Sequence, residues 1–408
     1  MATFQPLKGA RILILFPHMV TPGGALNYTL RLADVLAKQR AQVAILSLKT
    51  ERNSLAIPPG VEILSLNGPL TSSLRYWLLF PVWQAKLNRT IAAWQPDILI
   101  SQVFPSNWWG WLYKRRHPDI KMIWVSHEPS AFIHSPELID GLRPFWKKWL
   151  AKLLQPVLRP IDLSLAEHGD CIIANSHYTA EQIERVYSKK SSGIACPGID
   201  LDQFFPDDTP REYALITVAH LVPYKRIDFL LRVFAQLKER HRNLVFHIVG
   251  EGPTAGELQN LAHELGIGES VFFQGKLTHA ELAALLRRMT LFVFAGVKET
   301  FGMAPLEAIA SGTPVVAHKS GGPTEFVTRE CGLLIDSLRT EDWVMGISSY
   351  LEILEAQGFY PEQIRQCALK YDWSSSLRPA IEIIVRLFAQ QLQRPLPNNH
   401  GKKYGFEA

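Results

Sequence analysis

The chain of 408 residues is poor in cysteine. Its four cysteines, Cys171, Cys196, Cys331 and Cys367, include no C-x-x-C pair. This spacing argues against thiolate metal sites and dithiol redox motifs. The apolar segments around the cysteines predict buried, reduced thiols instead. Reduced thiols are typical of a cytoplasmic protein, so we expect that location.

Long hydrophobic runs are also absent. No stretch reaches the roughly 18 apolar residues that a membrane-spanning helix needs. The apolar run at 11–16 is short and lacks a small-residue cleavage site. It therefore predicts a first buried strand rather than a signal peptide.

The charge excess is small, with 43 basic and 38 acidic residues and a formal net charge of +5. It is too weak and too dispersed to indicate nucleic-acid binding, but it fits a partner that is partly anionic, such as a nucleotide or an acidic membrane. A G-x-G-x-x-G dinucleotide fingerprint is missing as well. Hydrophobic residues make up 47% and charged residues 20%, so the chain is globular and long enough for two domains.

Nearly all-apolar strand-like segments alternate with helical segments, which predicts an α/β protein with parallel sheets covered on both faces. The segment 197–206 interrupts this alternation and predicts a crossing between two doubly wound halves. We expect domains at 1–197 and 198–373, with a final helix at about 374–393 that packs back on the first. The predicted strands are 11–16, 42–47, 61–66, 97–101, 120–126, 171–175, 193–196, 213–219, 244–249, 271–274, 291–294, 314–317 and 332–335.

Two glutamates eight positions apart, Glu299 and Glu307, frame the most informative segment, Glu-Thr-Phe-Gly-Met-Ala-Pro-Leu-Glu. A strand-like run precedes it, and the sequence predicts a helix over 306–310. The free N–H groups and dipole of a helix N-terminus favour a phosphate. Carboxylates are poor phosphate ligands, but they accept hydrogen bonds from hydroxyls. The pair therefore predicts a site for a diphosphate flanked by sugars. Two glutamates at this spacing also occur by chance.

Other polar or small residues follow predicted strands, where ligands bind in such sheets. Gly23-Gly24 would let the backbone take positive φ and approach a ligand. Lys225 could neutralise a diphosphate, and the glycines of 249–253 could let the backbone contact a base. His127 and Glu128 should face the cleft between the halves. Each also has a simpler explanation, as a tight turn, a solvated lysine or a hydrogen-bonded loop histidine.

Asp200-Leu-Asp202 has the D-x-D form of some metal-dependent transferases, but it lies in the predicted crossing. We interpret it as turn chemistry, because aspartate is favoured in turns. No other His, Asp or Glu cluster has metal-ligand spacing, so no metal is expected.

The segment 143–154 is basic and rich in aromatic residues, and the region around 75–80 is similar. A basic amphipathic helix with tryptophan at its edge is typical of a segment that lies on an anionic bilayer. The alternative is a helix packed on the first domain with its lysines Lys147, Lys148 and Lys152 in solvent.

Taken together, these segments resemble the family 4 glycosyltransferases, which are retaining enzymes of the GT-B fold. The resemblance covers most of the chain and is strongest from about 171 to 325. It rests on the order and spacing of several short segments, each modest alone. These are 174–179, 197–200, Phe204, Lys225, 249–253, 299–307, 312–316 and 321–325.

The resemblance implies two Rossmann-like domains facing a central cleft, and roles for the residues in it. Glu299, His127 and Lys225 would act at the reacting centre, with Glu299 holding donor-sugar hydroxyls and Lys225 neutralising the diphosphate. Glu307 would bind the ribose hydroxyls. The remaining donor-binding residues would be Gly23, Gly24, His220, Gly250, Glu251, Phe301, Gly302 and Met303.

The implied reaction is transfer of a hexose from a nucleotide diphosphate sugar to a glycan or lipid-linked acceptor, without a cofactor and with retained anomeric configuration. The segment 321–325 is similar to that of mannosyltransferases and favours GDP-mannose. One departure is His220, which stands where the family usually has arginine. Histidine carries less charge and lacks the bidentate fork. Two alternatives therefore stay open: an epimerase or hydrolase on the same fold, or a catalytically impaired nucleotide-binding partner protein.

Overall fold

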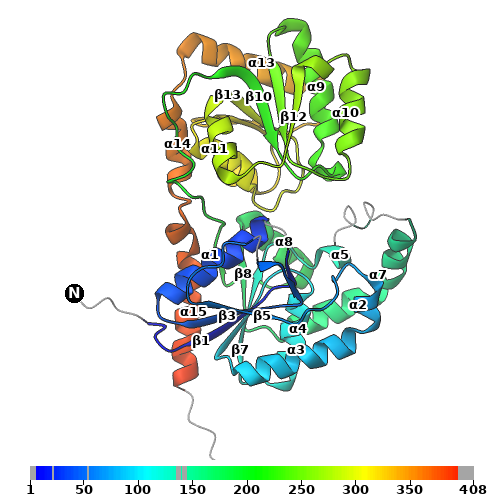
Figure 1. Cartoon of the computed structure of the whole chain (residues 1–408), viewed down its shortest axis with the longest axis vertical. Helices are drawn as coiled ribbons and strands as arrows, with labels where there is room; N and C mark the ends of the chain where they lie inside the picture. The colour runs from blue at the N-terminus through cyan, green and yellow to red at the C-terminus, as the bar shows by residue number, and fades with distance from the viewer. Residues whose placement is uncertain (1–5, 21–22, 53–54, 135–138, 140–144, 394–408) are drawn as a thin grey trace, which may run out of the picture.

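The computed structural model describes residues 6–20, 23–52, 55–134, 139 and 145–393. In these ranges the chain forms two parallel sheets, one above the other in Figure 1, with helices on both faces of each. The predicted α/β class and the two doubly wound halves are confirmed.

The first sheet has the strand order β5-β3-β1-β6-β7-β8-β9. Its central strands are mostly apolar and buried, as expected for strands covered on both faces. The small pair β2 (His18–Met19) and β4 (Lys49–Thr50) lies outside this sheet. The strands of the sheet are β1 (Arg11–Leu15), β3 (Gln42–Ser47), β5 (Val61–Ser65), β6 (Ile98–Ser101), β7 (Lys121–Ser126), β8 (Cys171–Ala174) and β9 (Gly193–Ile194).

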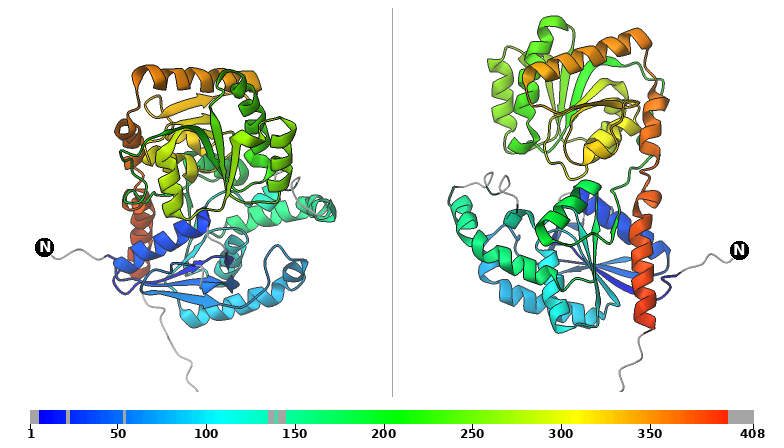
Figure 2. Two further views of the ribbon diagram at one scale, coloured as in Figure 1. Left: turned by 45° about the horizontal axis from the view of Figure 1, so that its top comes forward. Right: turned by 180° about the vertical axis from the view of Figure 1, so that it is seen from behind.

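The helices of this half connect successive strands. Those that face the second half in Figures 1 and 2 are α1 and α8. The helices are α1 (Gly24–Lys38), α2 (Leu74–Leu78), α3 (Phe80–Trp94), α4 (Ser106–Arg116), α5 (Ala131–His134), α7 (Phe145–Ala166) and α8 (His177–Tyr187).

The second sheet has the order β12-β11-β10-β13-β14-β15, and its pairs are parallel. Its strands are β10 (Glu212–Val218), β11 (Val245–Val249), β12 (Val271–Gly275), β13 (Met289–Phe294), β14 (Val315–His318) and β15 (Gly332–Ile335). The accompanying α-helices are α9 (Ile227–Arg240), α10 (Ala255–Glu264), α11 (His279–Arg288), α12 (Met303–Ala310), α13 (Thr340–Gln357) and α14 (Pro361–Leu369). Short 3-10 turns are η2 (Pro223–Lys225), η3 (Gly268–Ser270) and η4 (Gly322–Glu325).

The last helix, α15 (Trp373–Leu392), returns to the first half. Its apolar residues, among them Leu377, Ile384 and Phe388, share one core with the strands of the first sheet. Seen from behind, the helix runs along the side of that half (Figure 2). The second half is therefore connected to the first by two chain crossings.

Two local expectations are wrong. Helix α12 begins at Met303, three residues before the expected start, because Gly302 adopts φ +94° and turns the chain there. Pro305 is tolerated because it lies in the first helical turn. Of the four free thiols only Cys331 is buried, and the others are half-buried.

Candidate functional site

The loops at the carboxyl ends of the two sheets meet between the halves. The side chain of Ser176, at the start of α8, donates to the carbonyl oxygen of Thr300 at 2.5 Å. The N–H of Tyr178 donates to the Glu325 carboxylate at 3.0 Å, where the helix N-terminus favours a negative charge. A Cβ placed on Gly24 would lie 3.3 Å from the sulfur of Met303. The segment around Glu299 is therefore in contact with the first half.

Two of the predicted residues form an ion pair. The ammonium group of Lys225, at the end of η2, contacts the carboxylate of Glu299, and both side chains are largely buried. The ammonium nitrogen also lies 5.6 Å from the centre of the Phe294 ring. The structure thus brings together two residues that are 74 positions apart, at the edge where α12 begins.

The Glu299 segment is held by two glycines of the loop after β14. Gly322 donates its N–H to the Glu299 carbonyl at 2.7 Å. A Cβ on Gly321 would lie 2.2 Å from that carbonyl oxygen, and one on Gly322 would lie 2.2 Å from the Phe301 backbone. Both positions therefore require glycine. In the sequence, the segment 321–325 indicated the resemblance to family 4 glycosyltransferases, but it did not indicate that these glycines hold the Glu299 segment in place.

The residues after Glu299 divide between core and surface. The Phe301 side chain is 2% exposed and packs against Phe326 and Tyr371. Only its backbone can serve a ligand. Gly302 and Met303 form the start of α12, so their predicted N–H contacts with sugar and phosphate stay predictions.

Glu307 lies one turn inside α12 and is 9% exposed. Burial raises the pKa of its carboxyl to about 7. No hydrogen bond to its carboxyl oxygens is present within the described ranges. It lines a cavity of about 20 Å³ between the halves, together with Asn27 and Arg31 of α1. That volume suits one water molecule and is too small for a ribose.

His127 is neutral at physiological pH, because burial lowers the pKa of its imidazole to about 4. Its Nε2 lies 2.8 Å from Oε1 of Gln102, and its ring packs edge-on against Tyr28. With the Gln102 oxygen as acceptor, Nε2 carries the proton and Nδ1 remains an acceptor. His127 can therefore hydrogen-bond a hydroxyl, but it cannot supply charge.

The neighbouring Glu128 was noted at the end of its strand but not selected as a site residue. Its side chain is exposed to solvent, yet it stands among groups of both halves. The surrounding protein and the negative charge of Glu299 raise the pKa of the Glu128 carboxyl to about 7, and Lys225 opposes that shift. The signal that could have identified it was its position after a buried parallel strand.

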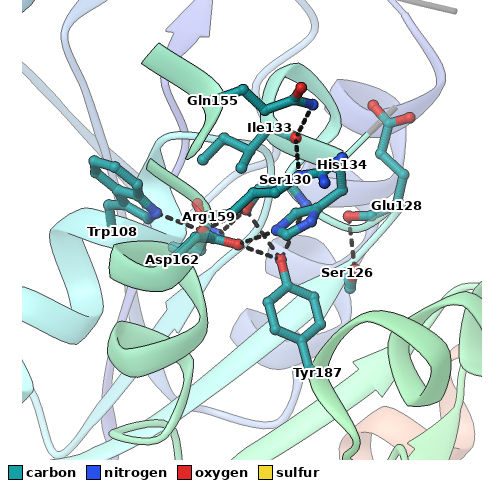
Figure 3. Close-up of polar contacts among 11 residues, drawn as sticks. Trp108, Ser126, Glu128, Ser130, Ile133, His134, Gln155, Arg159, Asp162 and Tyr187 are labelled. Atoms are coloured by element: carbon teal, nitrogen blue, oxygen red, sulfur yellow. Dashed lines mark hydrogen bonds and ion pairs between the residues drawn. The ribbon is translucent and has the colours of Figure 1, made fainter. Parts of the chain in front are cut away.

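Below the His127–Glu128 loop lies a buried polar cluster that the sequence did not reveal. The carboxylate of Asp162, in α7, is 0% exposed. It accepts hydrogen bonds from Trp108 at 2.5 Å, Ser130 at 2.8 Å and Tyr187 at 2.7 Å, and lies 2.9 Å from the His134 imidazole. Figure 3 shows the Asp162 cluster on one side of this loop and the Glu128 carboxylate pointing away from it. The cluster fixes the backbone that follows Glu128.

The remaining predicted positions are placed as follows. Gly23 is extended, with φ −165°, and Gly24 is the first residue of α1, so the expected use of positive φ is wrong there. Gly24 packs closely on the flexible side chain of Met303. Gly250 has φ +128°, and a Cβ on it would lie 1.9 Å from the Ala219 carbonyl oxygen. Glycine is therefore required at position 250 by the packing of the two loops, independently of any contact with a ligand.

His220 and Glu251 are exposed at the ends of β10 and β11. The N–H of Leu221 donates to the Glu251 carbonyl, which ties the two loops together. Asp200 and Asp202 belong to a turn, in which the Asp200 carbonyl accepts from the N–H groups of Gln203 and Phe204. The Asp200 carboxylate pairs with Arg31 at 2.8 Å. In the part of the chain that the structure describes, no three His, Cys, Asp or Glu side chains are grouped to hold a metal ion.

Two family models match the chain in succession. The model described as "Glycosyltransferase Family 4" matches residues 22–203, and the one described as "Glycosyl transferases group 1" matches residues 202–358. The D-inositol 3-phosphate glycosyltransferase of Mycobacteroides abscessus is 28% identical over 425 residues, covering 95% of this chain and 92% of that protein. The enzyme of the same description from Rhodococcus jostii is 27% identical over 83% of this chain and 81% of its own length.

Solved structures show the same architecture. Sucrose-phosphate synthase from Thermosynechococcus elongatus superimposes with a TM-score of 0.76 at 20% identity, covering 93% of this chain and all of that one. HepE from Anabaena, in complex with UDP and glucose, gives a TM-score of 0.72 at 20% identity, covering 91% and 98%. At this identity the likeness concerns the fold.

Proposed function

We propose that this chain, which belongs to family 4 of the glycosyltransferases and has their GT-B fold, is a hexosyltransferase. It moves a hexose from a nucleotide diphosphate sugar to a hydroxyl of a glycan or lipid-linked acceptor. The observation that supports this most is the Lys225–Glu299 ion pair beside the start of α12. A diphosphate at the helix N-terminus would compete for Lys225 and release Glu299 to accept hydrogen bonds from the sugar.

In this proposal the acceptor oxygen bonds to the anomeric carbon while the bond from that carbon to the diphosphate breaks, with retained configuration. The proton of the acceptor hydroxyl passes to an oxygen of the leaving diphosphate. Positioning and charge stabilisation of the leaving diphosphate supply the rate enhancement. Lys225 provides the positive charge, without a metal cofactor. The neutral His127 hydrogen-bonds the sugar, and Glu307 binds the ribose.

For the donor we propose GDP-mannose, on the strength of the 321–325 segment. UDP sugars are the competing choice, because HepE was solved with UDP and glucose. Either donor uses the same charge arrangement at Lys225.

We expect the melting temperature to rise with GDP and GDP-mannose, and less with UDP, ADP and their sugar conjugates. A ligand at about a hundred times its dissociation constant stabilises the folded state by roughly 2.7 kcal/mol, which a thermal melt detects. A shift with UDP alone would keep the enzyme class and remove mannose from the proposal. No shift with any nucleotide would contradict the proposed function.

The control for this screen is Lys225→Met, which should lose the shift with every diphosphate because it removes the neutralising charge. Incubation with donor alone then separates the alternatives. An epimerised sugar would contradict the transferase, and fast hydrolysis that an acceptor does not suppress would indicate a hydrolase. Activity that appears only in His220→Arg would support the impaired partner protein.

We also propose that the outer face of α7 rests on an anionic membrane. Trp149, Leu153 and Val157 follow one another at intervals of four residues, so they share one face of the helix, and they are 64%, 66% and 60% exposed. Lys152 lies between them in the sequence, and Lys148 and Arg159 lie just before and just after them. Exposed apolar side chains beside basic ones suit the boundary of an anionic bilayer.

Two other helices of the first half also carry exposed apolar side chains. Leu74 and Leu78 of α2 and Val82 of α3 are also exposed. Within the described residues no helix is long and apolar enough to cross a bilayer. The side chain of Lys147, predicted to join the membrane contact, lies outside the described set. Lys148 and Lys152 interact with other residues, so a lysine-reversal variant would test more than one contact.

The double variant Leu153→Glu/Val157→Glu is therefore the sharper test. It should lower co-sedimentation with phosphatidylglycerol vesicles about tenfold or more, because each exposed side chain would lose its burial in lipid. Met345→Glu/Ile353→Glu, which alters exposed apolar residues of α13, is the matched control and should bind as the wild type does. Equal binding by all three proteins would contradict the membrane contact.

A further inference from the structure

Glu128 is the acidic side chain that the first half presents to the Lys225–Glu299 pair. It follows β7 directly, and its carbonyl accepts a hydrogen bond from the Ser126 hydroxyl at 2.8 Å. Helix α8 links this loop to the second half, because the Thr179 hydroxyl donates to the His127 carbonyl at 3.4 Å and the Ser176 hydroxyl donates to the Thr300 carbonyl, next to Glu299. The pKa of Tyr224 is raised first by burial and then by the charges of Glu299 and Glu128, while Lys225 acts in the opposite direction. Four ionisable groups from both halves therefore act on one another electrostatically.

The Glu128 carboxyl oxygens have no hydrogen-bond partner among the described residues, and they remain open to solvent. The backbone that carries them is nevertheless fixed. Ser130, two residues on, donates its N–H to the Tyr187 hydroxyl and its side chain to Asp162, and His134 meets the same carboxylate. Figure 3 shows Glu128 directed away from that cluster. A rigid loop thus holds an unpartnered carboxylate at the meeting point of the two halves.

The position of Glu128 separates it from the charged residues assigned to the donor. Lys225, Glu299 and Glu307 all belong to the second half, whereas Glu128 comes from the first. A carboxylate is an acceptor-only group, so hydroxyls satisfy it best. It stands near another carboxylate, so an anionic group beside the reacting hydroxyl would meet repulsion from both.

We infer that Glu128 positions the acceptor: its carboxylate accepts a hydrogen bond from the hydroxyl that receives the sugar and selects a neutral, hydroxyl-bearing acceptor end. This rests on the proposed function and deepens it by naming the acceptor chemistry. Glu128 transfers no proton in this role. Any phosphate of the acceptor lies away from the reacting hydroxyl.

The pH dependence has a defined sign. The ionised form of Glu128 binds a hydroxyl more strongly than the protonated form, because charge-assisted hydrogen bonds are the stronger ones. With the carboxyl titrating near 7, transfer should rise as the pH increases through that value. The groups that face Glu128 are Lys225, Tyr224 and Glu299 of the second half, with the neutral His127 beside it, and all stay unchanged in a Glu128→Gln variant.

The test measures consumption of the donor that the nucleotide screen identifies, from pH 6 to 8.5. It is run at saturating donor, so that titration of Glu307 does not limit the rate, with octyl α-mannoside as acceptor and with water alone, since either supplies the attacking O–H group. Glu128→Gln should slow both reactions about 10- to 100-fold and remove the rise near pH 7, while the nucleotide-induced melting shift stays at its wild-type size. Glu269→Gln, an exposed carboxylate of η3 far along the chain from these loops, is the matched control and should behave as the wild type.

The possible results distinguish a wrong role for Glu128 from a wrong proposed function. Wild-type rates in both reactions for Glu128→Gln would overturn the inference. A reduced nucleotide shift would also overturn it, because Glu128 would then belong to the donor site. Loss of the nucleotide shift in the wild-type protein would contradict the proposed function itself. The melting temperature without nucleotide shows whether the variant is folded.

Discussion

Glu307→Gln is expected to stabilise the protein at pH 8 and, in the same variant, to weaken nucleotide binding. Burial raises the pKa of the Glu307 carboxyl from 4.5 to about 7, so the folded state prefers the protonated form. The folded state therefore loses stability as the pH rises from about 4.5 through 7. The full cost above pH 7 is roughly 3 kcal/mol, and a neutral glutamine avoids it. Melting temperature should rise by several degrees at pH 8.

The same substitution should weaken nucleotide binding about 10- to 100-fold, because an amide replaces the charged acceptor for the ribose hydroxyls. The measurement is a thermal melt at pH 5 and at pH 8, followed by nucleotide titration. At pH 5 the carboxyl is already mostly protonated, so the stability gain should be nearly absent and this pH provides the internal control. Unchanged nucleotide affinity would count against the ribose role, and an equal gain at both pH values would count against a buried charge.

Asp162→Asn is expected to lower the free energy of unfolding by about 3–5 kcal/mol. The carboxylate is fully buried and receives Trp108, Ser130 and Tyr187 as donors, with His134 as a fourth neighbour. The side-chain amide of the variant would present two N–H donors to Trp108, Ser130 and Tyr187, which are themselves donors at this position. Buried donors would then be left without an acceptor. The variant should also loosen the loop that carries Glu128. Urea unfolding measures the change.

Ser130→Ala is the control for the Asp162 cluster. It removes one donor and leaves the others in place, so it should lower the free energy of unfolding by about 1 kcal/mol. A double-mutant cycle with Asp162→Asn should show strong coupling, since the two side chains are 2.8 Å apart. Wild-type stability in Asp162→Asn would mean that the pocket relaxes around the amide.

Most of the fold could be predicted from the sequence because its strands are buried on both faces and read as short apolar runs. The start of α12 could not be predicted, because it depends on Gly302 adopting φ +94°, and hydrophobic periodicity does not indicate the backbone angle of a single residue. The amphipathic character of α7 was visible in its sequence. The sequence did not show which face of α7 is covered, because the buried face carries Asp162, and aspartate is a residue type that predicts exposure.

For the site, the sequence by itself determined which residues stand at carboxyl ends of parallel strands, namely Lys225, Glu299, His127 and Glu128, because strand order and chain direction place those ends at one edge. Only the tertiary structure decided which of them meet. Lys225 pairs with Glu299 across 74 residues, and the charges of both act on the Glu128 carboxyl of the other half. The packing of two separately folded sheets against each other sets those distances. That packing depends on contacts such as Gly24 with Met303 and Ser176 with Thr300, which no local pattern encodes.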